Sequence, residues 1–408
     1  MLTEQFFNLL LDLDENWSVQ DIAVNDDDEE VFIKVSYVGH QVREPDSKVM
    51  RGIYDHAPER KWRHLDTLQY KTYIQCRLPR VKTDDGNVIT IIPPWASKHG
   101  RHSYLFECFA IDLLRVTKNQ TKTAELLRCS FNVINRLMHA STQRGLARRD
   151  LDHQPLNHLS IDEKSFKKGH HYISVLSSPE TGNIIDVVEG RSSKAVEELF
   201  DGALTTDQQK AVQTMSMDMW QAYRNVTQKK MPDAEIVHDR FHLVKYLNDA
   251  IDKVRRREVK SEEELKNSRY ALLKNPQNLT QKQRLKFQAI QNANYQVSKA
   301  WQVRENFKDL FKQKPGKAEG FALFTQWTQN ALGKGIKEVS KVIKTFKDHL
   351  AGVVNALVYT ASNGMAERLN GKIQAVKCSG RGYRRFKNFR SAILFFHGGL
   401  DLYPLKRQ

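Results

Sequence analysis

Cysteine is scarce in this 408-residue chain: Cys76, Cys108, Cys129 and Cys378 are scattered, and no two form a CxxC pair. Such spacing predicts neither a disulfide framework nor a cysteine-based zinc site, and it fits a reducing cytosol. Long apolar runs are also missing, since none reaches the roughly 18 residues that a membrane span requires. The N-terminal apolar run lacks a preceding basic segment and ends in acids, which argues against a signal peptide. We therefore expect a soluble, cytoplasmic, globular protein.

Basic residues are absent from residues 1–30, which contain ten acids, although the whole chain has 64 Lys and Arg against 48 Asp and Glu. The net charge of +16 is therefore concentrated after residue 30. A basic surplus of this size favours a polyanionic partner, and nucleic acid is the commonest one. The alternative is a protein that is merely basic.

The first 150 residues divide into three segments by their patterns. Residues 1–30 are expected to form an acidic helix and linker. Residues 31–103 have strand-like runs at 31–38, 68–81 and 87–92, which predict a small β-rich module. Residues 104–150 have helical periodicity, and two helices at 121–128 and 132–142 around a tight break have the outline of a helix-turn-helix. Its second helix would present Asn132, Asn135 and Arg136 to a DNA major groove, although an ordinary helical hairpin has the same outline.

The remaining chain predicts an α/β fold. Strands are expected at 156–162, 171–178, 183–190, 212–218 and 234–239, with helices at 193–203, at 220–229 and from 241. Hairpins followed by crossover units describe a mixed sheet flanked by helices. Residues 151–250 and 351–400 would form this domain, residues 251–350 a helical insertion with an aromatic core, and residues 401–408 a C-terminal tail.

Three acids are suitably placed for chemistry in this sheet. Asp162 is expected to end the first strand, Asp218 the fourth, and Glu367 lies early in a late helix. If the two strands are neighbours, the acids can approach one cation, and carboxylates are the ligands that Mg²⁺ prefers. Taken singly, an acid at a strand end is more often a turn or capping residue, and an acid on a helix is more often solvated or stabilises the helix dipole. Glu163 and Asp239 are nearby alternatives.

The segment after Glu367 is strongly basic. Residues 367–390 contain eight bases and one acid, interleaved with glycines and aromatics, which suits contact with a nucleic-acid backbone. The candidate contacts are Arg368, Lys372, Lys377, Arg381, Arg384, Arg385 and Lys387, with Lys164, Lys167 and Lys168 beside Asp162. His238 and His242 are spaced four apart, but one closes a strand and the other opens a helix, so we do not predict zinc there.

Three sequence blocks are similar to those of a known family. They are IDEKSFKKGHHYISVL, SMDMWQAYRN with PDAEIVHDRFHLVKYLNDAIDKVRR, and SNGMAERLNGKIQAVKCSGRGYRRFKNFRSAILF. Their order and content resemble the catalytic blocks of the ISL3 family of bacterial insertion-sequence transposases. The resemblance implies an RNase H-like fold with a DDE triad of Asp162, Asp218 and Glu367.

The resemblance also implies an activity and partners. It implies cleavage and joining of double-stranded DNA at the terminal inverted repeats of the element and in target DNA. Mg²⁺ or Mn²⁺ would be the cofactor, as two ions about 4 Å apart. The protein is expected to be a homodimer in its DNA complex and to associate with the nucleoid. The family's N-terminal module carries paired zinc cysteines, whereas residues 31–100 here contain only Cys76, so no zinc is expected. The alternatives are a DNA-binding repressor or catalytically decayed transposase, and another RNase H-like nuclease.

Overall fold

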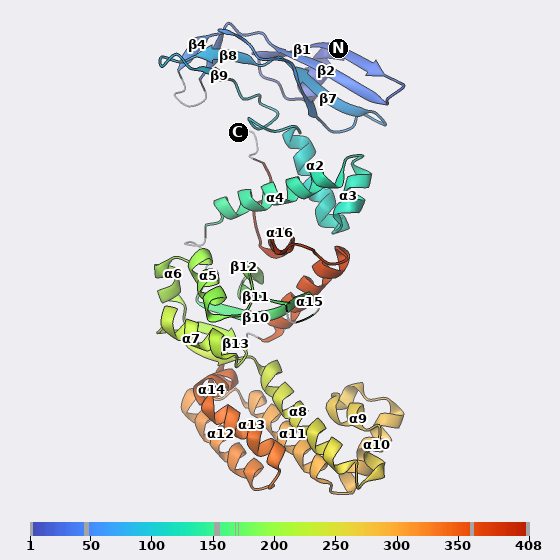
Figure 1. Cartoon of the computed structure of the whole chain (residues 1–408), viewed down its shortest axis with the longest axis vertical. Coiled ribbons are helices and arrows are strands. Elements are labelled where there is room, and N and C mark those ends of the chain that lie inside the picture. The colour runs from blue at the N-terminus through green and yellow to red at the C-terminus, as the bar shows by residue number, and fades with distance from the viewer. Residues whose placement is uncertain are drawn as a thin grey trace. The chain divides into compact units, whose positions relative to one another are not determined.

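The computed structural model describes residues 3–44, 49–150, 156–167, 169, 171–359 and 363–404, apart from the side chains of residues 3 and 363–367. The chain forms two compact units (Figure 1). The first comprises Met1–Arg148 with Leu400–Gln408, and the second comprises Arg149–Gly399. Each unit has its own hydrophobic core.

A β-sheet with the order β1-β2-β7-β6 dominates the first unit. Helix α1 (Thr3–Leu10) precedes β1 (Trp17–Asn25) and β2 (Glu30–Tyr37), and β6 (Arg60–Arg63) pairs with β7 (Lys71–Cys76). Alternate residues such as Val31, Ile33 and Val35 are buried, as a half-covered strand requires. Shorter strands complete the module: β3 (Gln41–Arg43), β4 (Met50–Gly52), β5 (Asp55–His56), β8 (Pro79–Lys82) and β9 (Val88–Thr90).

The expectation of a linker in residues 1–30 was wrong beyond α1. Residues 17–25 form strand β1, which pairs antiparallel with β2, and the acidic residues after Asn25 form the hairpin turn. Buried Trp17 and Val19 anchor β1 in the core. The acids hid this strand because they occupy its turn and its exposed positions.

Three helices follow the sheet: α2 (Tyr104–Thr117), α3 (Gln120–Leu126) and α4 (Phe131–Arg148). The side chains of Ser103 and Asn119 cap the first two by accepting backbone N–H bonds. Ala124 and Ile134 are buried between them, as their spacing predicts. Arg128 adopts a positive φ at the break between α3 and α4, which turns the chain sharply.

The second unit contains a mixed sheet with the order β12-β11-β10-β13-β14. Strands β10 (His158–Lys167), β11 (His171–Ser178) and β12 (Asn183–Glu189) are antiparallel neighbours, whereas β13 (Thr214–Met217) and β14 (Glu235–His238) run parallel to β10. Helices α5 (Ser193–Ala203), α7 (Gln221–Lys230) and α8 (Arg240–Glu258) occur where the sequence predicts them. The short helix α6 (Thr206–Ala211) was not predicted, although Thr205 and Gln208 form a capping box that signals its start.

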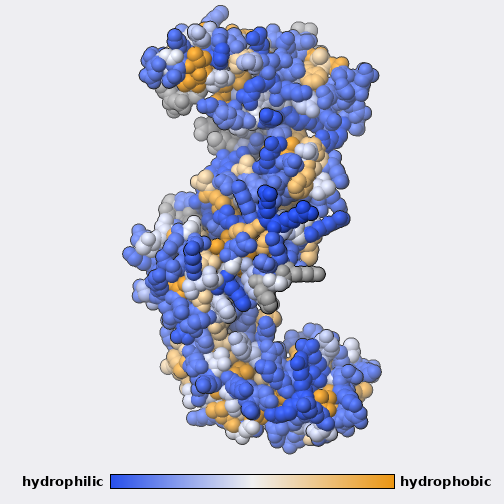
Figure 2. Space-filling model, in the orientation of Figure 1, coloured by the Kyte–Doolittle hydropathy of each residue, from blue (hydrophilic) through white to orange (hydrophobic). Residues whose placement is uncertain are grey.

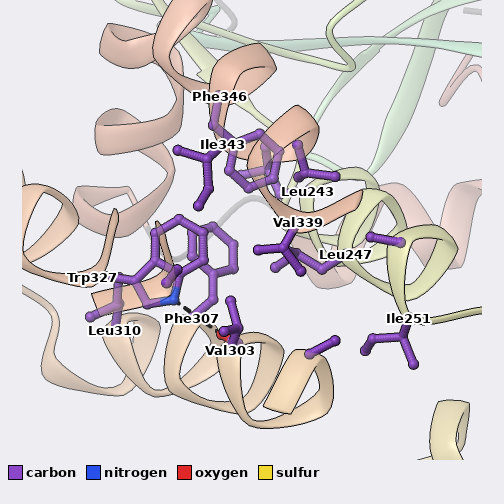
Figure 3. Close-up of a cluster of buried hydrophobic side chains, with 14 of the residues drawn as sticks. Leu243, Leu247, Ile251, Val303, Phe307, Leu310, Trp327, Val339, Ile343 and Phe346 are labelled. Carbon is purple, nitrogen blue, oxygen red and sulfur yellow. Dashed lines mark hydrogen bonds between the residues drawn. The ribbon is translucent and has the colours of Figure 1, made fainter. Parts of the chain in front are cut away.

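A helical insertion follows α8. It consists of α9 (Arg269–Leu273), α10 (Gln281–Asn292), α11 (Gln296–Gln313), α12 (Lys317–Leu332) and α13 (Lys337–Asp348), and α14 (Leu350–Val358) leads back to the sheet. Figure 3 shows its core, where Phe307, Trp327 and Phe346 pack together and the Trp327 indole donates to the Val303 carbonyl at 3.0 Å. The aromatics of this segment therefore form a core, as the sequence predicts.

Two helices complete the second unit: α15 (Asn363–Ser379) and α16 (Phe386–His397). Leu369, Ile373 and Val376 of α15 are buried. We interpreted the aromatics of this basic segment as nucleic-acid contacts, but Phe389 is fully buried and stacks on Phe166 of β10 at 5.4 Å between ring centroids. The helical spacing of the aromatics on α16 places them on its inner face, where they cover apolar residues of the sheet.

Hydrophilic residues cover much of the visible surface of both units (Figure 2). In the part of the chain that the structure describes, no helix is both long and apolar enough to cross a membrane.

Candidate active site

The register of two parallel strands brings Asp162 and Asp218 together. His158, Leu159 and Ser160 of β10 pair with Thr214, Met215 and Ser216 of β13. Continuing this register by two residues sets Asp162 opposite Asp218, the residue directly after β13. Neighbouring strands lie about 4.8 Å apart and opposite residues share a face, so the two carboxylates belong to one site.

The sequence led us to expect that Asp162 ends the first strand. Instead, Asp162 lies within β10. The strand continues to Lys167 because it pairs with β11 along most of its length, and Asp162 is opposite Val175 in that pairing. The shorter β13 stops at Met217. The half of β10 beyond Asp162 has no parallel neighbour among the described strands, and the Asp162 side chain itself is 17% exposed.

Three side chains from different elements surround the Asp162 carboxylate. The Asn370 amide on α15 donates to one carboxylate oxygen at 2.8 Å, and the Lys164 ammonium lies 3.5 Å from the same oxygen. The His242 Nε2 atom on α8 lies 3.9 Å from the other oxygen. Helices from distant parts of the sequence therefore converge on this acid.

Asp218 occupies a more buried position. Its carboxylate accepts the backbone N–H of Trp220 at 2.8 Å, which fixes its orientation. Burial raises the pKa of Asp218 above its usual value, and the charges of Glu163 and Asp162 raise it further, while His242 and the Trp220 N–H oppose this. The site thus gathers negative charge that a cation would stabilise.

Glu163 and Asp239 have structural partners. Alternate residues of a strand point to opposite faces, so Glu163 faces away from Asp162. The Glu163 carboxylate binds the Arg191 guanidinium at 2.6 Å. Asp239 accepts the Phe241 N–H at 2.7 Å and caps α8. Glu163 is therefore distinguished from Asp162 by its ion pair and its face of the strand, and Asp239 by its role as a cap.

Glu367 lies on α15, but its side chain is outside the described residues. The backbone of α15 passes β10 at two points, where Asn370 binds Asp162 and where Lys377 donates to the Ser165 carbonyl at 2.8 Å (Figure 1). Glu367 is one helical turn before Asn370. Among the described side chains, no group of three or more His, Cys, Asp and Glu is arranged to hold a metal ion.

The predicted DNA contacts fall into different surroundings. Lys168 is outside the described residues. Lys164 and Lys377 have the protein partners given above, and Lys167 is exposed. The other predicted bases are exposed on α15, between α15 and α16, or in the first turn of α16: Arg368, Lys372, Arg381, Arg384, Arg385 and Lys387.

On α4, two of the three residues predicted to face a major groove are exposed. They are Asn132 and Arg136. Asn135 is half-buried, and its side-chain oxygen is buried with no hydrogen-bond partner among the described residues, so it does not share their outward face. His238 and His242 do not converge, because His238 packs against His349 at 5.1 Å between ring centroids and His242 faces Asp162.

Sequence reasoning missed His242, Asn370 and Arg191 as neighbours of the site. His242 was considered only as a zinc ligand. Its position just after β14, a parallel neighbour of β13, could have identified it, because carboxyl ends of parallel strands share one edge of a sheet. No local signal marks Asn370 or Arg191, which depend on how α15 and the β12–α5 turn pack.

Comparisons with known proteins find a matching family and similar bacterial proteins. A family model described as a transposase, DDE_Tnp_ISL3, matches residues 159–393, more than half of the chain. The transposase for insertion sequence element IS1557 from two strains of Mycobacterium tuberculosis is 26% identical over 425 residues, covering 94% of this chain and 93% of that protein. The transposase for IS1001 from Bordetella parapertussis is 28% identical over 245 residues, covering 58% of this chain and 60% of that protein.

One solved structure is also similar, the Drosophila P element transposase strand transfer complex. Its TM-score is 0.35 at 8% identity, with 79% of this chain and 95% of that chain covered. The family model, which matches more than half of the chain, is sufficient to establish the family. The chain belongs to the ISL3 family of insertion-sequence transposases.

Proposed function

We propose that Asp162, Asp218 and Glu367 form the catalytic acid triad of this transposase. The observation that carries the proposal is the register of β10 and β13, which pairs Ser160 with Ser216 and, continued by two residues, would set Asp162 opposite Asp218. The hydrogen bond from Asn370 to Asp162 supports the third member, because it docks the helix that carries Glu367 against the first acid. Transposition would then proceed by cutting and joining DNA strands at this edge of the sheet.

The donor set fits divalent metal ions. Asp162 and Asp218 are carboxylates on one face, and Asp218 is buried beside other negative charges. Hard cations such as Mg²⁺ or Mn²⁺ are held by a few carboxylates together with phosphate oxygens of the substrate. Asp162, Asp218 and Glu367 would hold them, as two ions. When bound, such ions activate an attacking oxygen and stabilise a leaving oxygen in phosphoryl transfer.

The protein's own residues would orient this chemistry. Asn370 and the Glu163 N–H both donate to Asp162, and the Trp220 N–H donates to Asp218, so both carboxylates are fixed before DNA arrives. Preorganised groups lower the cost of reaching the transition state. Lys164 lies close enough to exchange its contact with Asp162 for a DNA phosphate.

The strand arrangement supports an RNase H-like fold. Three antiparallel strands, two further strands parallel to the first, and flanking helices are the arrangement that the family resemblance implies. In the first unit, α3 and α4 would act as a helix-turn-helix with Asn132 and Arg136 at a major groove. The exposed bases from Arg368 to Lys387 would contact the DNA backbone.

The partner would be double-stranded DNA carrying the terminal inverted repeats of the element, together with target DNA. A homodimer is the natural assembly because transposition brings two element ends together. Such a complex would work on the bacterial nucleoid in the cytoplasm.

The test is cleavage of a duplex that spans one end of the element encoding this chain. Asp162→Asn, Asp218→Asn and Glu367→Gln each remove a charge with little change in shape, and we expect each to lower single-turnover cleavage at least about a thousandfold. Binding of the duplex in a gel-shift assay should remain. Asp233→Asn is the matched control, since Asp233 is exposed before β14, at the opposite end of the sheet. Cleavage by Asp218→Asn at the wild-type rate would exclude Asp218 from the triad.

A further inference from the structure

Exposed aromatic side chains flank the Asp162 and Asp218 pair. Trp220, two residues after Asp218, is 39% exposed, and on α8 Phe241 is 56% and Tyr246 is 40% exposed. Phe241 precedes His242, which faces Asp162, and the charge of Asp218 helps to raise the pKa of Tyr246, after burial. Large apolar surface exposed around a polar site marks a place where something binds.

Trp220 is the most firmly held of these rings. Its indole N–H donates to the Arg191 carbonyl at 3.0 Å, and the Arg191 guanidinium lies 4.2 Å from its ring centroid. The same guanidinium lies 4.3 Å from the Tyr172 ring centroid and binds Glu163 at 2.6 Å. Arg191 is therefore fixed from three directions and supports the indole ring from one side.

This arrangement leaves a rigid aromatic surface beside the acids. Arg191 covers one side of the indole, so the exposed part of Trp220 belongs to the remainder of the ring. An aromatic ring that is already immobilised loses little conformational entropy when a flat partner stacks on it. Nucleobases are such partners, and stacking on an aromatic side chain does not depend on which base is present.

We propose that Trp220 is a stacking subsite for an unpaired nucleobase next to the phosphodiester that is cleaved. Within a duplex, base faces are covered by their neighbours, whereas a base at a strand break or an unpaired end has a free face. Stacking on Trp220 would hold such a base and so align the adjoining phosphate with Asp162 and Asp218. The inference rests on the proposed function of these acids, and it adds a binding site for the base.

The position of Trp220 allows its ring and its backbone to be tested separately. Its backbone N–H orients Asp218, and a side-chain substitution leaves that donor in place. Trp220→Phe retains an aromatic face, whereas Trp220→Leu retains apolar bulk over Arg191 without one. Comparing these two variants separates stacking from packing. Tyr270→Ala is the matched control, because Tyr270 is 60% exposed on α9 in the insertion.

The experiment is single-turnover cleavage of element-end duplexes in which one nucleotide near the cleaved phosphodiester is made abasic. We expect Trp220→Leu to cleave the intact duplex about tenfold more slowly than wild type, and Trp220→Phe to stay within about threefold. In wild type, one abasic position should cost a similar factor. In Trp220→Leu, that same position should cost nothing further, because the base has already lost its partner.

Two results would overturn the subsite. One is an abasic penalty in Trp220→Leu that equals the wild-type penalty at every position, and the other is wild-type cleavage of the intact duplex by Trp220→Leu. Tyr270→Ala should behave as wild type on every duplex. The triad proposal is tested independently of the stacking proposal. If the triad proposal is wrong, Asp218→Asn will cleave DNA, whatever the Trp220 variants do.

Discussion

His238 illustrates how the surroundings of one residue set its chemistry. It ends β14 with a side chain that is 2% exposed, packed against His349 and so close to Gly352 that a Cβ there would lie 2.5 Å from the imidazole. Burial, together with the smaller effect of the charge of His349, lowers the pKa of His238 to about 4. Its imidazole is therefore neutral in the folded protein at neutral pH.

The low pKa of His238 predicts that acid weakens the fold. Below about pH 6.5 the unfolded chain binds a proton at His238, whereas the folded chain does not until about pH 4, so stability falls as the pH falls through this window. Between about pH 7.5 and 5.5 this group should cost about 1 kcal/mol of unfolding free energy. In urea unfolding, His238→Leu should therefore lose about 1 kcal/mol less stability than wild type between about pH 7.5 and 5.5.

The control is His171→Gln, because His171 is exposed on β11 and should leave the pH dependence unchanged. An equal loss of stability with acid in His238→Leu and in wild type would show that His238 is not held neutral by the fold.

Single acids were predictable from the sequence only in part. Asp162 and Asp218 could be found because each follows an apolar strand pattern, and strand order then makes them neighbours. The contact of Asp162 with Asn370 could not be found, since it joins residues 208 positions apart through packing, whereas the position of His242 after β14 offered a signal that was not used. Asp162 and Glu163 could not be separated by sequence alone, because only the register decides which face each one occupies.

At the scale of elements, α15 carries Glu367, the proposed third acid. Leu369, Ile373 and Val376 form its buried stripe, with a spacing typical of one helical face. Polar contacts at Asn370 and Lys377 fix its position along β10. The placement of Glu367 therefore depends on how firmly this helix docks.

Ile373→Ala should loosen α15. Ile373 is 3% exposed, and truncating a buried isoleucine to alanine costs about 2–5 kcal/mol of stability. We expect faster amide hydrogen exchange along α15, with much smaller changes in α11 and α12, and slower cleavage as the temperature rises. Gln374→Ala, at the exposed neighbouring position, should change neither quantity. Unchanged exchange along α15 in Ile373→Ala would contradict its docking role.

Whether a segment forms a helix or a strand was easier to predict than what each of its faces packs against. The strands and helices around the sheet follow their sequence periodicity. However, residues 17–25 were missed as a strand because acids dominate that region, and they become strand β1 only through pairing with β2. The aromatics near α16 were assigned to nucleic acid because bases surround them, whereas the sheet covers them.

At the scale of the whole molecule, the insertion shares its hydrophobic core with the sheet of the second unit. This core includes Met219 from the turn after β13, Val237 of β14 and Val353 of α14. It also includes Leu243 of α8, which Figure 3 labels. The helix that bears His242 is thus shared by the acid site and the insertion. We infer that the insertion supports the site and could not be removed without exposing this core.

The metal dependence of Asp218→Cys tests the central claim most directly. A thiolate is a softer ligand than a carboxylate and suits Mg²⁺ poorly, while Mn²⁺ tolerates it better. If Asp218 holds the ion used for cleavage, Asp218→Cys should leave element-end DNA uncut in Mg²⁺ and regain measurable cleavage in Mn²⁺, with wild type active in both. Cleavage by Asp218→Cys at the wild-type rate in Mg²⁺ would contradict the account.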